Sequence, residues 1–255
     1  MPHSLARAAL LAAALLVPAA LSAQPWDRPE VTAERAGSVP AGDARVVEVE
    51  ARAGSLRIEG RPGLRDVRAH GTARASSREI LERVRLRVER SASGVLVRVE
   101  TPDELRDEEW TALDLVVEVP GDMPLRVQDG SGDVVIRAVG PLELEDGSGG
   151  IDVEGVGGAL RVHDGSGEIR LVDVRGDVQI EDGSGDVGLR GARGTVRLSD
   201  GSGGVDLRDV GGSVLVERKG SGGMHVAGVT GDLVVDRSYR RGISYSDVRG
   251  RVQVP

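Results

Sequence analysis

Residues 164–182 read DGSGEIRLVDVRGDVQIED, and this stretch decides the fold. Its opening tetrapeptide, Asp-Gly-Ser-Gly, occurs five times, beginning at Asp129, Asp146, Asp164, Asp182 and Asp200. Successive copies are 17, 18, 18 and 18 residues apart. A fixed period of this length, with alternating aliphatic residues closed by a glycine-rich turn, is typical of a solenoid whose repeats stack as successive coils.

Each repeat contributes five aliphatic columns. In the quoted stretch they are Ile169, Leu171, Val174, Val178 and Ile180. The members of each outer pair are two residues apart, so they share one face of a short strand, while Arg170 and Gln179 between them face outward. The sequence therefore predicts an all-β protein, a single parallel β-solenoid with coils of about 18 residues.

Glycines occupy both predicted corners of a coil. One corner is Asp-Gly-Ser-Gly, where the aspartate is expected to cap a backbone N–H of the turn along one edge of the solenoid. The other follows the single apolar residue between the strands, and we expect positive φ there. Its glycines are Gly140, Gly158, Gly176, Gly194, Gly212, Gly231 and Gly250.

The chain divides into four segments. Residues 1–23 read as a signal peptide, with Arg7 before an apolar stretch and a small-residue cleavage zone. Residues 24–44 are rich in Pro, Gly and Ala and predict a flexible leader. Residues 45–120 keep strand patterns with an irregular period, which predicts opening coils of the same solenoid, and residues 121–255 form its regular coils.

Composition narrows the class of partner. The formal net charge of −8 argues against nucleic acid. There is no cysteine, hence no disulfide framework, and no later apolar stretch is long enough for a transmembrane anchor. We expect an exported protein, located in a periplasm, on an outer surface or in the medium.

The segment LVVEVPGDMPLRVQDGSGDVVI, residues 115–136, leads into the serial Asp-Gly-Ser-Gly coils. From near Val46 onward, the chain resembles the bacterial putative-adhesin β-solenoid family, an envelope or secreted domain of unknown function. Glu118, Val119 and Pro120, followed by repeated Ser-Gly units, carry the resemblance. The resemblance implies a β-solenoid exported to the cell envelope. The family has no catalytic residues that could be assigned to positions in this sequence. The last coil departs from the pattern at residues 239–241.

Four aspartates are candidate metal ligands: Asp146, Asp164, Asp182 and Asp200. Oxygen-rich turns stacked at a fixed rise suit calcium, and the period is twice the nonapeptide of calcium-binding β-rolls. The second half of each unit lacks the corresponding glycine-rich turn, so we favour turn capping and expect no cofactor. His163 falls between Glu145 and Glu181 in an outward column, and no second histidine completes a zinc site.

A possible contact surface lies near the C-terminal end, where basic residues replace the acidic column and two apolar residues adjoin them. Its members are Leu215, Val234, Arg218, Lys219, Arg237, Tyr239, Arg240 and Arg241. The partner would be an unknown envelope component, such as an acidic polymer, or a second copy in weak, salt-sensitive self-association. The alternative is that these residues reflect sequence drift on the surface of a degenerate last repeat.

No group of residues in the sequence has the pattern of a catalytic site, so we predict no enzyme activity. The favoured hypothesis is a non-catalytic exported envelope solenoid, an adhesin-like structural or binding scaffold. A calcium-dependent β-roll-like protein is the alternative. A carbohydrate-acting β-helix enzyme fits less well, because the coils are minimal and the chain has two Trp and two Tyr for sugar stacking.

Overall fold

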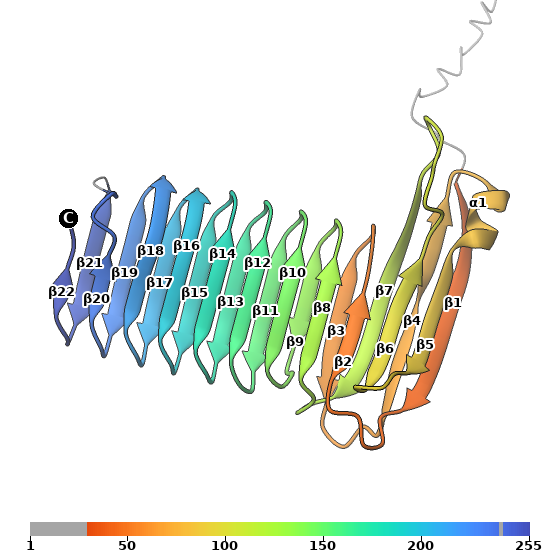
Figure 1. Ribbon diagram of the computed structural model, residues 1–255, viewed down its shortest axis with the longest axis horizontal. Coiled ribbons are helices and arrows are strands. Elements are labelled where there is room, and N and C mark those ends of the chain that lie inside the picture. Colours follow the sequence, from red (N-terminus) through yellow and green to blue (C-terminus); the bar gives the residue numbers. More distant parts are fainter. Residues whose placement is uncertain (1–29, 240–241) are drawn as a thin grey trace, which may run out of the picture.

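The computed structural model describes residues 30–239 and 242–255, which form a rod of stacked β-strands (Figure 1). The predicted signal peptide, residues 1–23, lies outside the described residues. The strands belong to two sheets of 11 strands each.

The first sheet contains most of the odd-numbered strands. Its order is β1 (Val31–Pro40), β4 (Asp66–Ala75), β7 (Thr111–Pro120), β3 (Leu56–Arg61), β9 (Val134–Arg137), β11 (Ile151–Val156), β13 (Ile169–Val174), β15 (Val187–Ala192), β17 (Val205–Val210), β19 (Met224–Val229) and β21 (Ile243–Val248). The second sheet runs β5 (Arg85–Arg90), β6 (Val95–Glu100), β2 (Val47–Glu50), β8 (Leu125–Asp129), β10 (Leu142–Asp146), β12 (Leu160–Asp164), β14 (Val178–Asp182), β16 (Val196–Ser202), β18 (Val214–Ser221), β20 (Leu233–Val235) and β22 (Val252–Gln253).

From β8 onward, each coil gives one strand to the second sheet and the next strand to the first. Neighbouring strands are parallel and in register: Val178 of β14, for example, pairs with Leu160 on one side and Val196 on the other. Each strand thus forms backbone hydrogen bonds with its counterpart in the next coil, which lies about 4.8 Å away. The predicted parallel β-solenoid with coils of about 18 residues is confirmed.

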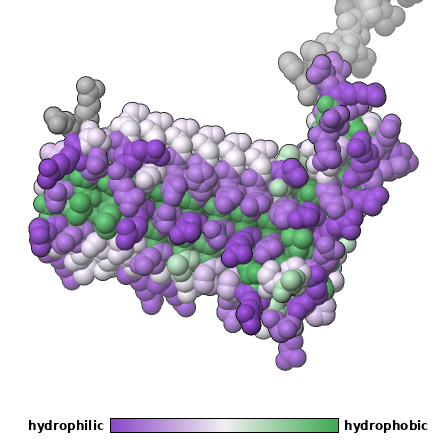
Figure 2. Space-filling model, in the orientation of Figure 1, coloured by the Kyte–Doolittle hydropathy of each residue, from purple (hydrophilic) through white to green (hydrophobic). Residues whose placement is uncertain are grey.

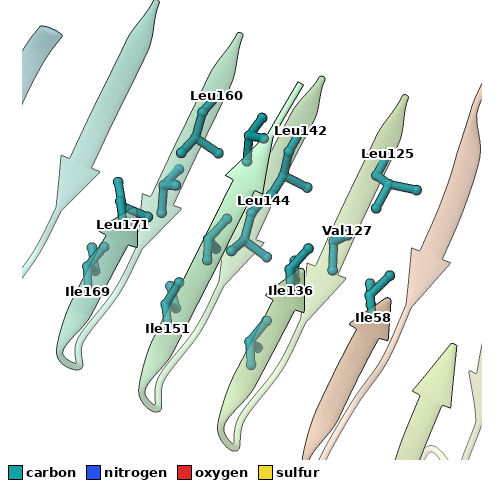
Figure 3. Packing of buried hydrophobic residues seen from close by; sticks show 14 of the residues in the cluster. Ile58, Leu125, Val127, Ile136, Leu142, Leu144, Ile151, Leu160, Ile169 and Leu171 are labelled. Atoms are coloured by element: carbon teal, nitrogen blue, oxygen red, sulfur yellow. The ribbon is translucent and has the colours of Figure 1, made fainter. Parts of the chain in front are cut away.

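The core fills the space between the two sheets, and its side chains point toward one another from both (Figure 3). Val178 and Ile180 are 1% and 0% exposed, whereas Gln179 between them is partly exposed. Ile169, Leu171 and Val174 of the same coil are equally buried. The five aliphatic columns are therefore confirmed.

One predicted corner uses its glycine differently. Positive φ occurs before the single apolar residue, as at Asp173 (φ 56) and Gly191 (φ 80), and not at the glycine column that follows it. Glycine is required in this column because a side chain would not fit: a Cβ on Gly176 would lie 2.6 Å from the backbone N of Ala159. At the Asp-Gly-Ser-Gly corner, Gly185 does have positive φ.

The N-terminal region departs from the predicted series of opening coils. β2 and β3 form one coil and β6 and β7 form another, but the later pair lies outside the earlier one, so β2–β3 is inserted between β6–β7 and β8–β9. Antiparallel strands complete this end, with β4 on β7, β1 on β4 and β5 on β6.

The predicted leader is partly ordered. Within residues 24–44, β1 pairs with β4 along its whole length, from Val31 opposite Ala75 to Pro40 opposite Asp66. Val31, Ala33 and Val39 on its inner face pack against the core, which explains why this Pro- and Gly-containing stretch forms a strand. A short helix, α1 (Arg78–Arg83), covers the same end of the rod (Figure 1).

Candidate functional site

The aspartates of the repeated tetrapeptide form a buried column. We call Asp129, Asp146, Asp164, Asp182 and Asp200 the aspartate column; each is the register partner of the next. Their side chains are between 0% and 8% exposed. The sequence-based expectation of a column is correct, but the carboxyls lie in the interior instead of along an outer edge.

The alternation of the strand explains this placement. In β14, Val178, Ile180 and Asp182 are two residues apart and all three are buried, while Gln179 and Glu181 face solvent. The strand continues through the aspartate before the chain turns, so the carboxyl shares the face of the aliphatic residues. The period of two in the sequence contained this signal.

The carboxyls of the column have few hydrogen-bond donors. Among the described residues, the carboxyl oxygens of Asp129, Asp146 and Asp182 have no donor in full hydrogen-bonding geometry. Backbone N–H groups of the turns, such as those of Gly130 and Ser184, approach them and partly offset the rise in pKa. Asp164 Oδ1 accepts from the backbone N–H of Ser166 at 3.2 Å, which is the turn capping that the sequence predicts. A buried acceptor without a hydrogen-bond partner lowers the stability of the fold, so these carboxyls need hydrogen-bond donors from another source.

Protonation supplies the missing donors. Burial, and next the charge of Asp146, raises the pKa of Asp129 from 3.8 to about 7. Burial and the charges of Asp200 and Asp164 raise the pKa of Asp182 to about 7, and burial and Asp146 raise that of Asp164 to about 6. Burial also raises the pKa of Asp146. A protonated carboxyl both donates and accepts, so neighbours in the column satisfy one another when they share protons.

Lys219 continues the aspartate column in the next coil. Its Nζ lies 2.7 Å from Asp200 Oδ2, and both side chains are 0% exposed. The same Nζ lies 2.8 Å from the backbone oxygen of Gly203 and also contacts that of Ser221. The column therefore ends in a buried pair of a basic and an acidic group.

A one-residue bulge turns Lys219 inward. The pairing of β16 with β18 shifts after Leu198, so that Arg218 pairs with Ser199 and Lys219 pairs with Asp200. Arg218 consequently faces solvent. The sequence holds a sign of this: residues 219–222 read Lys-Gly-Ser-Gly, the repeated tetrapeptide with Lys in place of Asp, 19 residues after Asp200.

The ring of Tyr239 lies next to Lys219. The tyrosine is 3% exposed, its ring centroid lies 5.7 Å from Nζ, and its hydroxyl donates to the backbone oxygen of Gly222 at 2.5 Å. A cation above an aromatic face is attracted to it. Burial raises the pKa of the Tyr239 hydroxyl, so it remains the donor.

The structure therefore divides the predicted contact surface. Lys219 and Tyr239 are buried and belong to the interior, which corrects their assignment to the surface. Arg218 and Arg237 are exposed, and Leu215 and Val234 are register partners on the outer face of the second sheet. Residues 240 and 241 lie outside the described residues. Figure 2 shows hydrophobic surface near the C-terminal end of the face in view, among hydrophilic side chains.

His163 lies where the outward column predicts it, in register with Glu145 and Glu181. Its Nδ1 is 3.5 Å from a carboxylate oxygen of Glu181, and both side chains are well exposed. Within the described ranges, no group of three or more His, Cys, Asp or Glu side chains is arranged to hold a metal ion.

A groove along the second sheet was not anticipated from the sequence. It has a volume of about 1030 Å³ and follows the first residues of β8, β10, β12, β14 and β16. Segments 43–46 and 90–94 form its wall, where Arg90 contacts the backbone oxygen of Ala41 and the Asp43 carboxylate. The groove thus crosses five coils at right angles to the strands.

One row of side chains lines this groove. We call it the groove row: Arg126, Glu143, Arg161, Gln179 and Arg197, which are successive register partners. Arg126 lies 3.3 Å and Arg161 3.9 Å from Glu143, so two arginines share one carboxylate. All three arginines are more than half exposed. The row was readable in the sequence as one outward column of the repeats.

Among the described residues, no helix is both long and apolar enough to cross a membrane. No protein-family model matches the chain, and no curated protein matches it either. Solved structures with a similar chain path do exist.

A putative cell adhesion protein from Clostridium sporogenes is 13% identical, with a TM-score of 0.36, and the match covers 88% of this chain and 99% of that one. A putative adhesin from Bacteroides fragilis is 12% identical, with a TM-score of 0.34 and coverage of 87% and 96%. A putative adhesin from Parabacteroides merdae is 11% identical, with a TM-score of 0.35 and coverage of 86% and 95%. At such identities and TM-scores, the likeness does not assign this chain a function.

Proposed function

We propose that this chain is a non-catalytic, exported, adhesin-like scaffold that binds a linear acidic polysaccharide of the cell envelope along its arginine groove. The observation that carries the proposal is the position of Arg126, Arg161 and Arg197 on alternate coils of one groove.

The spacing of these arginines suits an extended polyanion. Alternate coils are two strand spacings apart, so the guanidinium groups recur about every 10 Å along the groove. Each guanidinium has a planar fork of donors that matches a carboxylate. Because the coils are hydrogen-bonded into a rigid stack, the polymer meets a preformed row and the protein loses little conformational freedom on binding.

The charge of the groove differs from that of the whole protein. Its lining contains five arginines, which include Arg45 and Arg90 of the wall, against three acidic residues. One of these, Asp177, already accepts a hydrogen bond from the backbone N–H of Thr195 at 2.8 Å. The chain as a whole has a net charge of −8. A basic groove on an acidic body attracts a polyanion to one place and repels it elsewhere.

Binding of polygalacturonate, a linear polymer of carboxylate sugars, tests the proposal, with dextran as the neutral polymer. Isothermal titration at two salt concentrations should show salt-sensitive binding of the acidic polymer alone. The variant Arg161→Glu/Arg197→Glu should bind at least about tenfold more weakly, since it loses two charge-assisted contacts. Arg170→Glu/Arg190→Glu, the matched control on the outer face of the first sheet, should bind like the parent. Equal binding by the groove variant and the parent would overturn the groove as the site.

The same incubation tests the non-catalytic part of the proposal. The length distribution of the polymer, measured by size-exclusion chromatography, should not change with time. A progressive shortening would make the protein a polysaccharide-degrading enzyme instead.

Export depends on residues 1–23. In a bacterial host, the full chain should accumulate outside the cytoplasm with its N-terminus at residue 24, and deletion of residues 2–23 should retain it in the cytoplasm. An unprocessed chain in the cytoplasmic fraction would contradict export.

A further inference from the structure

Lys219 is the one lysine in the sequence, and its amine is wholly buried. A charged amine is costly to bury, and an ion pair in the interior often adds no stability over apolar residues of similar size. Elsewhere this chain uses arginine for its positive charges, and lysine occurs only at this buried position. The Lys219–Asp200 pair therefore calls for an explanation beyond charge pairing.

We infer that Lys219 Nζ and Asp200 Cγ are joined by an intramolecular amide bond, formed after the chain folds. The reaction is a condensation: the N–C bond forms, a carboxyl C–O bond breaks, and one water leaves. The ammonium and the carboxylate together carry the two protons and the oxygen that depart as water, so no oxidant, reductant or other reactant is required.

Proximity favours this bond. Nζ is 2.7 Å from Asp200 Oδ2, so the carboxyl carbon is one bond beyond the contact. Reacting groups held at such a separation behave as if at very high concentration. The pair sits beside Leu198 and Val216 in the sheet core, and Tyr239 covers it. The released water lies in an apolar environment, which favours its departure. The product replaces two buried charges with a neutral amide.

The backbone around Lys219 sets the direction of the amine. The oxygens of Gly203 and Ser221 accept hydrogen bonds from Nζ, and a backbone oxygen has no proton to donate. After one proton passes from Nζ to Asp200, the neutral amine keeps two N–H bonds for these two oxygens. Its lone pair is then the remaining direction, toward the carboxyl of Asp200.

Asp182 is the proton donor that the reaction needs. It is the register partner of Asp200 on the side opposite Lys219, and it is 2% exposed. Because burial raises its pKa to about 7, about half of the molecules hold a proton on it at neutral pH. It can protonate the oxygen that leaves as water, and the second proton that Nζ loses, as the N–C bond forms, restores it. Asp182 is in this sense a catalytic residue, since it faces the reacting carboxyl.

Mass spectrometry of the purified full chain tests the inference directly. Trypsin cleaves after Arg197, Arg208, Arg218 and Arg237. An amide at Lys219 blocks cleavage after that residue, so peptides 198–208 and 219–237 should appear as one joined species, lighter than their sum by one water. A parent protein that yields free peptide 198–208 and cleavage after Lys219 would overturn the inference.

Two variants separate chemistry from charge. Lys219→Arg keeps the positive charge and cannot form the amide, so trypsin should cleave after residue 219 and release peptides 198–208 and 220–237 separately, while circular dichroism stays unchanged. Asp182→Asn keeps the reacting pair and removes the proton donor, so the joined fraction in freshly purified protein should fall at least severalfold. Asp146→Asn, two coils from Asp182, should leave it unchanged. A joined fraction in Asp182→Asn equal to that of the parent would remove Asp182 from the mechanism.

Discussion

Asp164 of β12 and Asp182 of β14 are register partners in the interior of the solenoid, where they are 1% and 2% exposed. Two carboxyls one strand spacing apart in an apolar interior cannot both be charged without a large cost. Protonation of one makes it a donor to the other. The aspartate column therefore behaves as a ladder of shared protons, and its behaviour with pH can be measured.

The first prediction concerns the stability of the fold between pH 4 and pH 8. Folding raises the pKa of Asp129 and Asp182 from 3.8 to about 7 and that of Asp164 to about 6. In this window, the folded chain binds more protons than the unfolded chain, so the free energy of unfolding should fall as pH rises from about 4 to about 7 and then level off. Urea denaturation followed by circular dichroism at several pH values measures this slope.

Surface acids act in a different range. Arg98 lowers the pKa of Glu50, and Arg137 lowers that of Asp152, so their stabilisation is lost only as pH falls below about 4. Stability that increased steadily from pH 4 to pH 7 would contradict the protonation of the column.

The second prediction replaces one member of the column. Asp164→Asn supplies a donor and an acceptor in the same shape without a charge. At pH 8 it should raise the free energy of unfolding by about 1 kcal/mol, because one buried charge is removed, and at pH 4 it should have little effect. The exposed Asp173→Asn is the control and should change neither value. Destabilisation by Asp164→Asn at pH 8 would mean that the column needs its charges.

The third prediction concerns the register. Val187 is 1% exposed, so Val187→Asp places an unpaired charge between the sheets and should lower the free energy of unfolding by about 3 kcal/mol or more. Val172→Asp makes the same change on the outer face and should cost about 1 kcal/mol or less. Chemical denaturation of the two variants measures the difference, and similar losses in both would be inconsistent with the packing.

The fourth prediction is that the protein needs no calcium. Carboxyls with raised pKa values are poor ligands for a hard cation, which binds the charged form. Addition of a chelator should leave the circular dichroism spectrum and the melting temperature unchanged. Tight, stoichiometric calcium binding by titration calorimetry, lost in Asp164→Ala and Asp182→Ala, would support a β-roll instead.

The repeat alone was sufficient to predict the regular part of the solenoid. Ile169, Leu171, Val174, Val178 and Ile180 recur with a period that one stacked coil satisfies, and each pair alternates as a strand does. Burial, register and strand direction follow locally, because each coil contacts only its two neighbours. The resemblance to an envelope family also came from sequence, and its function remains a proposal.

Four features depended on tertiary structure. The insertion of β2–β3 between β6–β7 and β8–β9, and the pairing of β1 with β4, join segments far apart in the chain whose order no local period encodes. The groove needs a wall from residues 43–46 and 90–94 against coils later in the chain. The burial of Lys219 rests on a single bulge that shifts β18 by one residue. Since side chains alternate with a period of two, that shift exchanges outside for inside, and it turned the one lysine from the surface to the carboxyl of Asp200.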